Sequence, residues 1–153
     1  MFERILVPVD GSAPSRKGLR EAIAVAKLTG ARIKVLHVWE PPFLAIGTEA
    51  ALMRGEDIYN VSREAGQRVL SEAAESVKAA GIAVDEQLEE HGGQRLCELV
   101  AATANNWRAS LIVLGSHGRR GLSRMLLGSD AEQILRTAPA PVLLVRDDDE
   151  AKA

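Results

Sequence analysis

A glycine-rich stretch near the carboxyl end is the part of the sequence with the clearest chemical meaning. Gly115, Gly118 and Gly128 allow the backbone to approach a ligand closely and to offer N–H donors. Ser129 follows at the start of an expected helix, where the first N–H groups lack partners within the helix. Between these glycines the sequence has no acidic residue but contains Arg119, Arg120 and Arg124. The combination predicts a loop that binds an anion.

A simpler interpretation of the same stretch is a solvated surface loop whose glycines serve only as turns. Neither ordinary nucleotide fingerprint, GxxxxGK[ST] or GxGxxG, is present. Ser129 and Glu132 also have the spacing of a capping box, which needs no ligand. The residues by themselves leave both interpretations open.

Two further side chains are candidates for contact with a ligand. His117 lies within the glycine-rich stretch and offers a ring N–H to an anion. Asp10 ends the first predicted strand, and its carboxylate either contacts a ligand or accepts from amides of the helix that follows Ser12. His37 is expected to be a core or pocket-edge histidine, because the histidines do not have the spacing of a zinc site.

The composition excludes several classes of protein. With 153 residues, 46% of them hydrophobic and 26% charged, the chain is expected to fold as a single domain with a full core. A net charge of −2 argues against general nucleic-acid binding, which needs a basic excess. No apolar run approaches the ~20 residues of a membrane helix, and no leader opens the chain, so we expect a cytoplasmic protein that does not insert into membranes.

The hydrophobic pattern predicts short apolar strands that alternate with amphipathic helices. The expected strands are 4–10, 32–39, 82–89, 111–114 and 141–145, and the expected helices follow Ser12 up to Gly30 and cover 61–80, 96–107 and 131–138. This alternation is typical of an α/β domain with a parallel sheet and helices on both faces. We expect the domain to cover 1–146, with an acidic tail at 147–153.

The strand ends are where such a sheet binds ligands. The site of a doubly wound sheet lies beyond the carboxyl ends of the strands, where the strand order reverses. This rule points to Asp10, to Val38 and Trp39, and to the loop after Leu114. The connection over 41–56 is longer than usual for such a sheet, which indicates a functional loop or lid.

Along essentially its whole length, the sequence resembles the universal stress protein family. The pattern Gly115-x2-Gly118-x9-Gly128-Ser129 matches the ATP-binding pattern G-x2-G-x9-G-[ST] of that family at every specified position. The opening Ile-Leu-Val-Pro-Val-Asp-Gly-Ser and the later Ala-Pro-Val-Leu-Leu-Val are also similar to the family.

The resemblance implies a fold, a ligand and an assembly. The fold would be a single doubly wound, Rossmann-like domain with a five-stranded parallel sheet in the order 3-2-1-4-5. The ligand would be ATP, with Mg²⁺ or Mn²⁺ carried on its phosphates. The family pairs its last strand across a two-fold axis, which implies a homodimer through the strand at 141–146.

The resemblance also implies roles for individual residues. Pro8, Val9 and Val38 would lie near the adenine and Asp10 near the ribose, while Leu114 and Gly115 would border the sugar and phosphates. Gly118, Gly128 and Ser129 would hold the triphosphate. The full set of expected nucleotide contacts is Pro8, Val9, Asp10, Val38, Leu114, Gly115, His117, Gly118, Arg119, Gly128, Ser129 and Asp130.

Asp130 departs from the family, which commonly has valine at this position. An acid in the first turn of a helix is favourable to the helix dipole, by roughly 0.3–1 kcal/mol. Beside a triphosphate the same charge repels unless a cation bridges the two. Asp130 therefore weakens ATP binding, recruits a metal ion or points away, and the sequence leaves these three alternatives open.

Three functions are compatible with this sequence. The first, which we favour, is an ATP-binding regulatory protein whose occupancy an unknown partner detects. The second is a slow ATPase or nucleotide hydrolase of the same fold, although no residue is assigned as a catalytic base. The third is a dimeric interaction module that binds no nucleotide. The intact glycine pattern argues against the third, and Asp130 supports it.

Overall fold

Five parallel strands form one sheet in the order β3-β2-β1-β4-β5, as predicted. The computed structural model describes residues 1–42, 55–116 and 127–146. The strands are β1 (Arg4–Pro8), β2 (Arg32–Trp39), β3 (Val84–Glu90), β4 (Leu111–Gly115) and β5 (Val142–Val145). The helices are α1 (Ala13–Thr29), α2 (Gly55–Ala79), α3 (Leu96–Trp107) and α4 (Ser129–Thr137).

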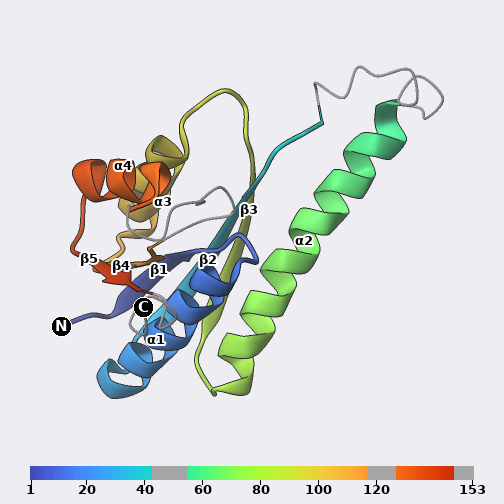
Figure 1. Ribbon diagram of the computed structural model, residues 1–153. Helices are drawn as coiled ribbons and strands as arrows, with labels where there is room; N and C mark the ends of the chain where they lie inside the picture. The colour runs from blue at the N-terminus through green and yellow to red at the C-terminus, as the bar shows by residue number, and fades with distance from the viewer. Residues whose placement is uncertain (43–54, 117–126, 147–153) are drawn as a thin grey trace, which may run out of the picture.

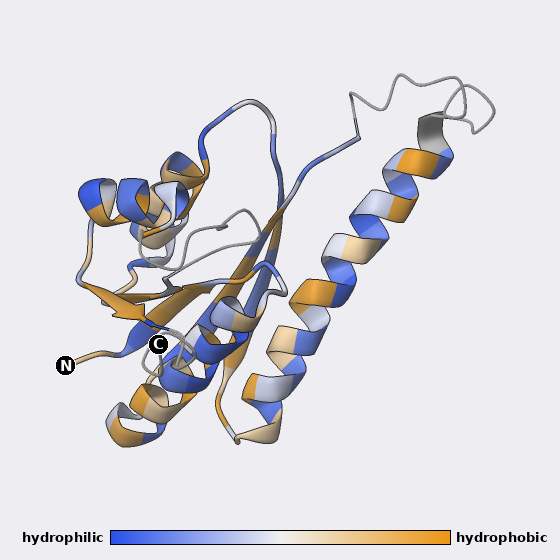
Figure 2. Ribbon diagram, viewed as in Figure 1, coloured by the Kyte–Doolittle hydropathy of each residue, from blue (hydrophilic) through white to orange (hydrophobic). Residues whose placement is uncertain are grey.

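Helices cover both faces of the sheet (Figure 1). On one face α1 and α2 pack against Ile5, Val7 and Ile33, and on the other α3 and α4 pack against Leu6 and Ile112. Neighbouring strand residues point to opposite faces, so Ile5 and Leu6 lie in different halves of the core. Figure 2 accordingly shows the central strands in orange and the helices striped in orange and blue.

The first helix begins and ends where its cap residues predict. The hydroxyl of Ser12 accepts a hydrogen bond from the amide of Ser15 at 3.3 Å, and Gly30 ends the helix with a φ of 71°. This left-handed conformation favours glycine, because a side chain would be strained there. The predicted N-cap at Ser12 is confirmed.

Several boundaries differ from the sequence prediction. The first strand ends at Pro8 instead of residue 10: the Val9 amide still bonds to Leu36 of β2, but the Asp10 amide already bonds to Ser15 in α1. The third strand begins at Val84 instead of residue 82, since the amide of Ile82 still bonds to the carbonyl of Val77 at the end of α2. The second helix begins earlier than predicted, at Gly55. Most of the expected long connection, residues 43–54, lies outside the described residues.

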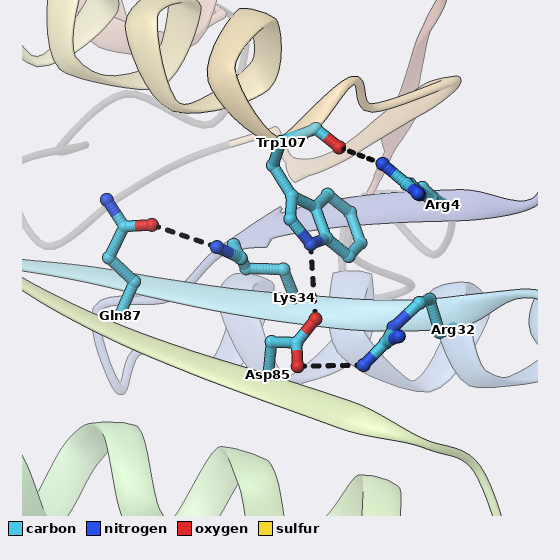
Figure 3. A network of polar contacts seen from close by, with 6 residues as sticks. All are labelled: Arg4, Arg32, Lys34, Asp85, Gln87 and Trp107. Atoms are coloured by element: carbon cyan, nitrogen blue, oxygen red, sulfur yellow. Dashed lines mark hydrogen bonds and ion pairs between the residues drawn. The ribbon is translucent and has the colours of Figure 1, made fainter.

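A polar network joins the amino-terminal ends of β1, β2 and β3 to the end of α3 (Figure 3). The indole N–H of Trp107 donates to the Asp85 carboxylate at 3.1 Å, and Arg32 donates to the same carboxylate at 2.8 Å. The Lys34 ammonium lies 5.4 Å from the centre of the Trp107 ring, and Arg4 donates to the Trp107 carbonyl. The network fixes α3 over β2 and β3, at the end of the sheet away from the carboxyl ends of the strands.

In the described parts of the chain, no helix combines the length and the apolar character needed to cross a bilayer.

Candidate functional site

A cavity of about 620 Å³ lies at the carboxyl ends of β1, β2 and β4. The strand order reverses between β1 and β4, which is where the doubly wound fold places ligands. The walls come from the β1–α1 turn, the end of β2, the amino-terminal part of α2 and the starts of α3 and α4.

The structure brings together every predicted site residue that it describes. The residues that line this one cavity are Pro8, Val9, Asp10, Val38, Leu114, Gly115, Gly128, Ser129 and Asp130. They come from four separate segments of the sequence, 8–10, 38, 114–115 and 128–130. Three other predicted residues, His117, Gly118 and Arg119, lie outside the described residues.

Hydrogen bonds hold the β1–α1 turn in place beside the cavity. The amide of Val9 donates to the carbonyl of Leu36 at 2.8 Å, and the amide of Asp10 donates to the Ser15 hydroxyl at 3.1 Å. One carboxylate oxygen of Asp10 accepts from the amide of Ser12 at 2.8 Å. Asp10 therefore partners the amide of the N-cap residue, one position before the helix amides that the alternative role named. This hydrogen bond is compatible with ligand contact, because Asp10 also lines the cavity.

His37 is a buried histidine at the edge of the cavity, as predicted. Its side chain is 6% exposed, and its Nδ1 lies 2.7 Å from the carbonyl oxygen of Val9. A carbonyl oxygen only accepts hydrogen bonds, so Nδ1 carries the hydrogen in this contact. The bond links β2 to the turn that contains Asp10.

Gly115 has a structural role that is independent of any ligand. A Cβ atom at this position would lie 2.5 Å from the carbonyl oxygen of Pro14, closer than atoms can pack. Gly18 is also close, since its Cβ would lie 3.1 Å from the amide of Gly115. The two glycines let α1 pack directly against the end of β4, so the first glycine of the sequence pattern is needed for the fold itself.

The start of α4 differs from the expected capping box. The N-cap is Gly128, and Ser129 is the first residue of the helix. The reason is that the carbonyl of Gly128 already accepts the amide of Glu132 at 2.9 Å, which places the helix start one residue earlier. Glu132 instead forms an ion pair with Arg136 at 2.8 Å. Ser129 is therefore not used as a cap, and it lines the cavity.

The opposite end of the cavity is apolar and partly aromatic. Trp39 is 5% exposed, and its ring meets the ring of Tyr59 edge to face, with 4.9 Å between ring centres. A Cβ on Gly66 would lie 2.9 Å from the Cβ of Trp39, so this glycine lets α2 approach β2. The Tyr59 hydroxyl donates to Glu90 at 2.7 Å, and this hydrogen bond raises the pKa of Tyr59 above its ordinary value.

The cavity has further walls that the site prediction did not include. Trp39 lies where the strand-end rule places it, but the α2 and α3 contributions have no local sequence signal. The additional lining residues are Ser15, Leu36, His37, Trp39, Glu40, Ser62, Ala65, Gly66, His91, Arg95, Leu96, Ala131, Gln133 and Ile134. Glu40 directly follows the predicted strand, so the same rule applied one residue further would have found it.

The charges on the described part of the lining are mixed. The lining includes the carboxylates of Asp10, Glu40 and Asp130 and one guanidinium, that of Arg95, which forms an ion pair with Glu98 at 3.4 Å. Within the described ranges, no three His, Cys, Asp or Glu side chains are grouped so as to hold a metal ion. The Ser129 hydroxyl and the Asp130 carboxylate are hard oxygen ligands of the kind that Mg²⁺ and Mn²⁺ take when phosphates supply the remaining oxygens.

Two solved structures similar to this chain contain nucleotides. One is the crystal structure of a universal stress protein in complex with cAMP, with a TM-score of 0.65, 23% identity and coverage of 95% of this chain and 97% of that chain. The other is a universal stress protein family protein of Arabidopsis thaliana with AMP bound, with a TM-score of 0.69, 15% identity and coverage of 99% and 96%.

Sequence comparison gives a consistent result. A universal stress protein of Methanocaldococcus jannaschii is 32% identical over 147 residues, which are 95% of this chain and 83% of that protein. A crystal structure of a family protein from Burkholderia pseudomallei is 30% identical with a TM-score of 0.73 and covers 94% of this chain and 96% of that one. A sequence model of the universal stress protein family matches residues 1–146. The chain belongs to the universal stress protein family.

Proposed function

We propose that this protein binds an adenine nucleotide, which we take to be ATP, and that it acts as a regulatory protein. A partner protein would detect whether the nucleotide site is occupied. The observation that carries the proposal is the cavity at the switch point of the sheet. One end of this cavity is apolar, at Val38 and Trp39, and the other is the amino end of α4, at Gly128 and Ser129. A nucleotide has the same polarity, with a flat base at one end and an anion at the other.

The backbone of Val38 supports recognition of the base. The carbonyl of Leu36 accepts the Val9 amide and so faces β1. Alternate residues of a strand point their N–H and C=O groups to the same side, so those of Val38 also face the β1 side. The β1 strand has ended at Pro8, and Val38 lines the cavity there. A donor and an acceptor side by side complement the ring nitrogen and amino group of adenine.

The amino end of α4 supports recognition of the phosphates. The first N–H groups of a helix have no partners within it, and the helix dipole attracts an anion. Gly128 and Ser129 bring this end to the cavity wall. Asp10 lines the same cavity and is the expected contact of the ribose. We place the remaining phosphate contacts, as the sequence predicts, on Gly118, Arg119 and His117, with Mg²⁺ or Mn²⁺ carried on the phosphates.

The nucleotides in two related structures agree with this proposal. Both cAMP and AMP contain adenine, and the proteins that hold them share the fold of this chain. Each of these ligands has a single phosphate. The proposal that this chain binds a triphosphate therefore depends on its own residues at the phosphate end of the cavity.

The first experiment identifies the ligand. We expect the denatured, purified protein to release an adenine nucleotide, and calorimetry on the emptied protein to show ATP binding more tightly than GTP. Gly128→Val and Gly118→Val are each expected to abolish ATP binding with the circular dichroism spectrum unchanged, because a side chain fills space meant for phosphate. Gly92→Val is the matched control, since that glycine is exposed and does not line the cavity. Normal ATP binding in both phosphate-end variants would contradict the proposal.

One observation favours a second candidate function, an interaction module without nucleotide. Asp130 puts a negative charge at the end of the cavity where the phosphates are proposed to bind. This alternative predicts that the protein releases no nucleotide and that ATP does not raise the melting temperature.

In either case, we propose that the protein is a homodimer through the strand at 141–146.

A further inference from the structure

Asp130 is an exposed acid at the phosphate end of the cavity. It is the second residue of α4, directly after Ser129, and it lines the cavity. Its place on the cavity wall favours the two alternatives in which its charge acts on the ligand.

The Asp130 carboxylate differs from the neighbouring acids in its contacts with the described part of the chain. Among the described residues it forms no hydrogen bond or ion pair, whereas Asp10 accepts from the Ser12 amide and Glu132 pairs with Arg136. A lone carboxylate in the first turn interacts favourably with the helix dipole as long as the site is empty. Its charge remains available to whatever occupies the cavity.

The Asp130 charge has opposite effects on free ATP and on its complex with a divalent cation. A free triphosphate meets a like charge beside the helix end, and the repulsion opposes the attraction of the helix amides. When a divalent cation accompanies the triphosphate, the carboxylate faces a positive ion. Mg²⁺ is commonly bound by one or two carboxylates together with phosphate oxygens, so a single aspartate is sufficient.

We propose that Asp130 makes nucleotide binding depend on a divalent cation, so that the site selects the Mg²⁺ complex of ATP over free ATP. This inference rests on the proposed nucleotide-binding function. Asp130 acts as a specificity-determining residue: it penalises the uncomplexed triphosphate and offers one oxygen to the cation. The Ser129 hydroxyl lies next to it in the sequence and is the second hard oxygen on this wall.

The experiment measures ATP affinity by calorimetry in the presence of Mg²⁺ and, separately, of a chelator. For the unmodified protein we expect affinity to fall about tenfold when Mg²⁺ is removed, since one exposed carboxylate acts on several phosphate charges. Asp130→Asn is expected to raise the affinity for free ATP. The ratio of the affinity with Mg²⁺ to the affinity with chelator is then expected to be about twofold or less. Asp130→Glu, which restores the charge, is expected to restore the dependence.

Glu132→Gln is the matched control. Glu132 lies in the same first turn of α4, but it pairs with Arg136 and does not line the cavity. Both variants remove one negative charge from the same helix end, so their effects on the helix dipole are similar. Only the Asp130 variant removes a charge from the cavity. Adenosine, which has no phosphate, is expected to bind all variants equally with and without Mg²⁺.

The outcomes separate this inference from the proposed function. The inference is overturned if the unmodified protein binds free ATP and its Mg²⁺ complex equally, or if Asp130→Asn keeps the same ratio as the unmodified protein. It is also overturned if Glu132→Gln reduces the ratio as much as Asp130→Asn does. If the unmodified protein binds ATP in neither condition, the proposed function itself fails and the inference fails with it.

Discussion

Gly115 shows that one residue of a sequence pattern can be needed for the fold rather than for a ligand. We predict that Gly115→Ala lowers the free energy of unfolding by about 1–3 kcal/mol, because the new Cβ would overlap the backbone of Pro14. Chemical denaturation measures this, with Gly92→Ala as the control, since a Cβ there meets only the end of the Gln94 side chain at 3.6 Å. Equal stability of the two variants would show that α1 adjusts without cost.

This prediction affects how site mutants are interpreted. Loss of nucleotide binding in a Gly115 variant would not establish contact with the ligand, because the fold itself is perturbed. Gly128, whose φ of −56° is accessible to any residue, tests the phosphate end more directly.

Tyr59 provides a test of the aromatic end of the cavity. It is the only tyrosine in the chain, so ultraviolet absorbance against pH reports its ionisation without overlap. We predict that the pKa of Tyr59 lies above 10.0, chiefly because its hydroxyl donates to Glu90, and that Glu90→Gln lowers it toward the ordinary value. A pKa unchanged by the substitution would mean that the contact is not formed in solution.

The sign of the linked stability effect follows from the direction of this shift. A folded-state pKa above the unfolded value means that the protonated tyrosine is favoured in the folded protein. The resulting stabilisation is fully present below the unfolded pKa and is lost as the pH rises through the folded pKa. Acidification below neutral pH therefore leaves this contribution unchanged.

Among the secondary-structure elements, α3 is attached to β1, β2 and β3 by the network around Trp107. We predict that Asp85→Ala lowers the free energy of unfolding by about 1–2 kcal/mol, since it leaves the part-buried indole N–H of Trp107 without its acceptor. The Arg32 ion pair is expected to contribute about 0.5 kcal/mol or less, because both side chains are substantially exposed (47% and 34%). Denaturation of Asp85→Ala beside Arg32→Ala separates the two contacts. If Arg32→Ala were as costly as Asp85→Ala, the ion pair would be the dominant contact.

At the scale of the whole molecule, β5 is the last strand of the described sheet, next to β4, and it is where we propose that two copies pair. Leu143 on this strand is 38% exposed, and an exposed apolar edge strand favours pairing with a second copy. We predict that the protein is a dimer in sedimentation experiments and that Leu143→Asp makes it monomeric.

Leu135→Asp is the control for this prediction, because Leu135 has nearly the same exposure, 37%, but lies on α4. It is expected to leave the dimer intact. A monomeric unmodified protein, or a dimer that survives Leu143→Asp, would contradict assembly through 141–146. The expected boundary at residue 146 and the cytoplasmic location stay predictions.

Local patterns in the amino-acid sequence are sufficient to predict the alternation of strands and helices and the segments from which the site is built. Buried strands such as Leu111–Gly115 are continuous apolar runs, and a cap such as Ser12 lies next to the helix it begins, so both signals are local. Because strand direction fixes the ligand end of a parallel sheet, Asp10 and Val38 could be assigned to the site from the sequence alone. The strand order came from the family resemblance.

Packing between separate elements determines which side chains meet across the cavity, and no local pattern predicts it. Gly66 in α2 and Arg95, the N-cap of α3, have no local signal for the site, and they reach it because of where α2 and the start of α3 pack against the sheet. The close approach of Gly115 to Pro14 and the position of Asp130 on the cavity wall likewise depend on helix packing. A sequence pattern encodes periodicity over a few residues, whereas the distance between separate elements is set by the whole packed core.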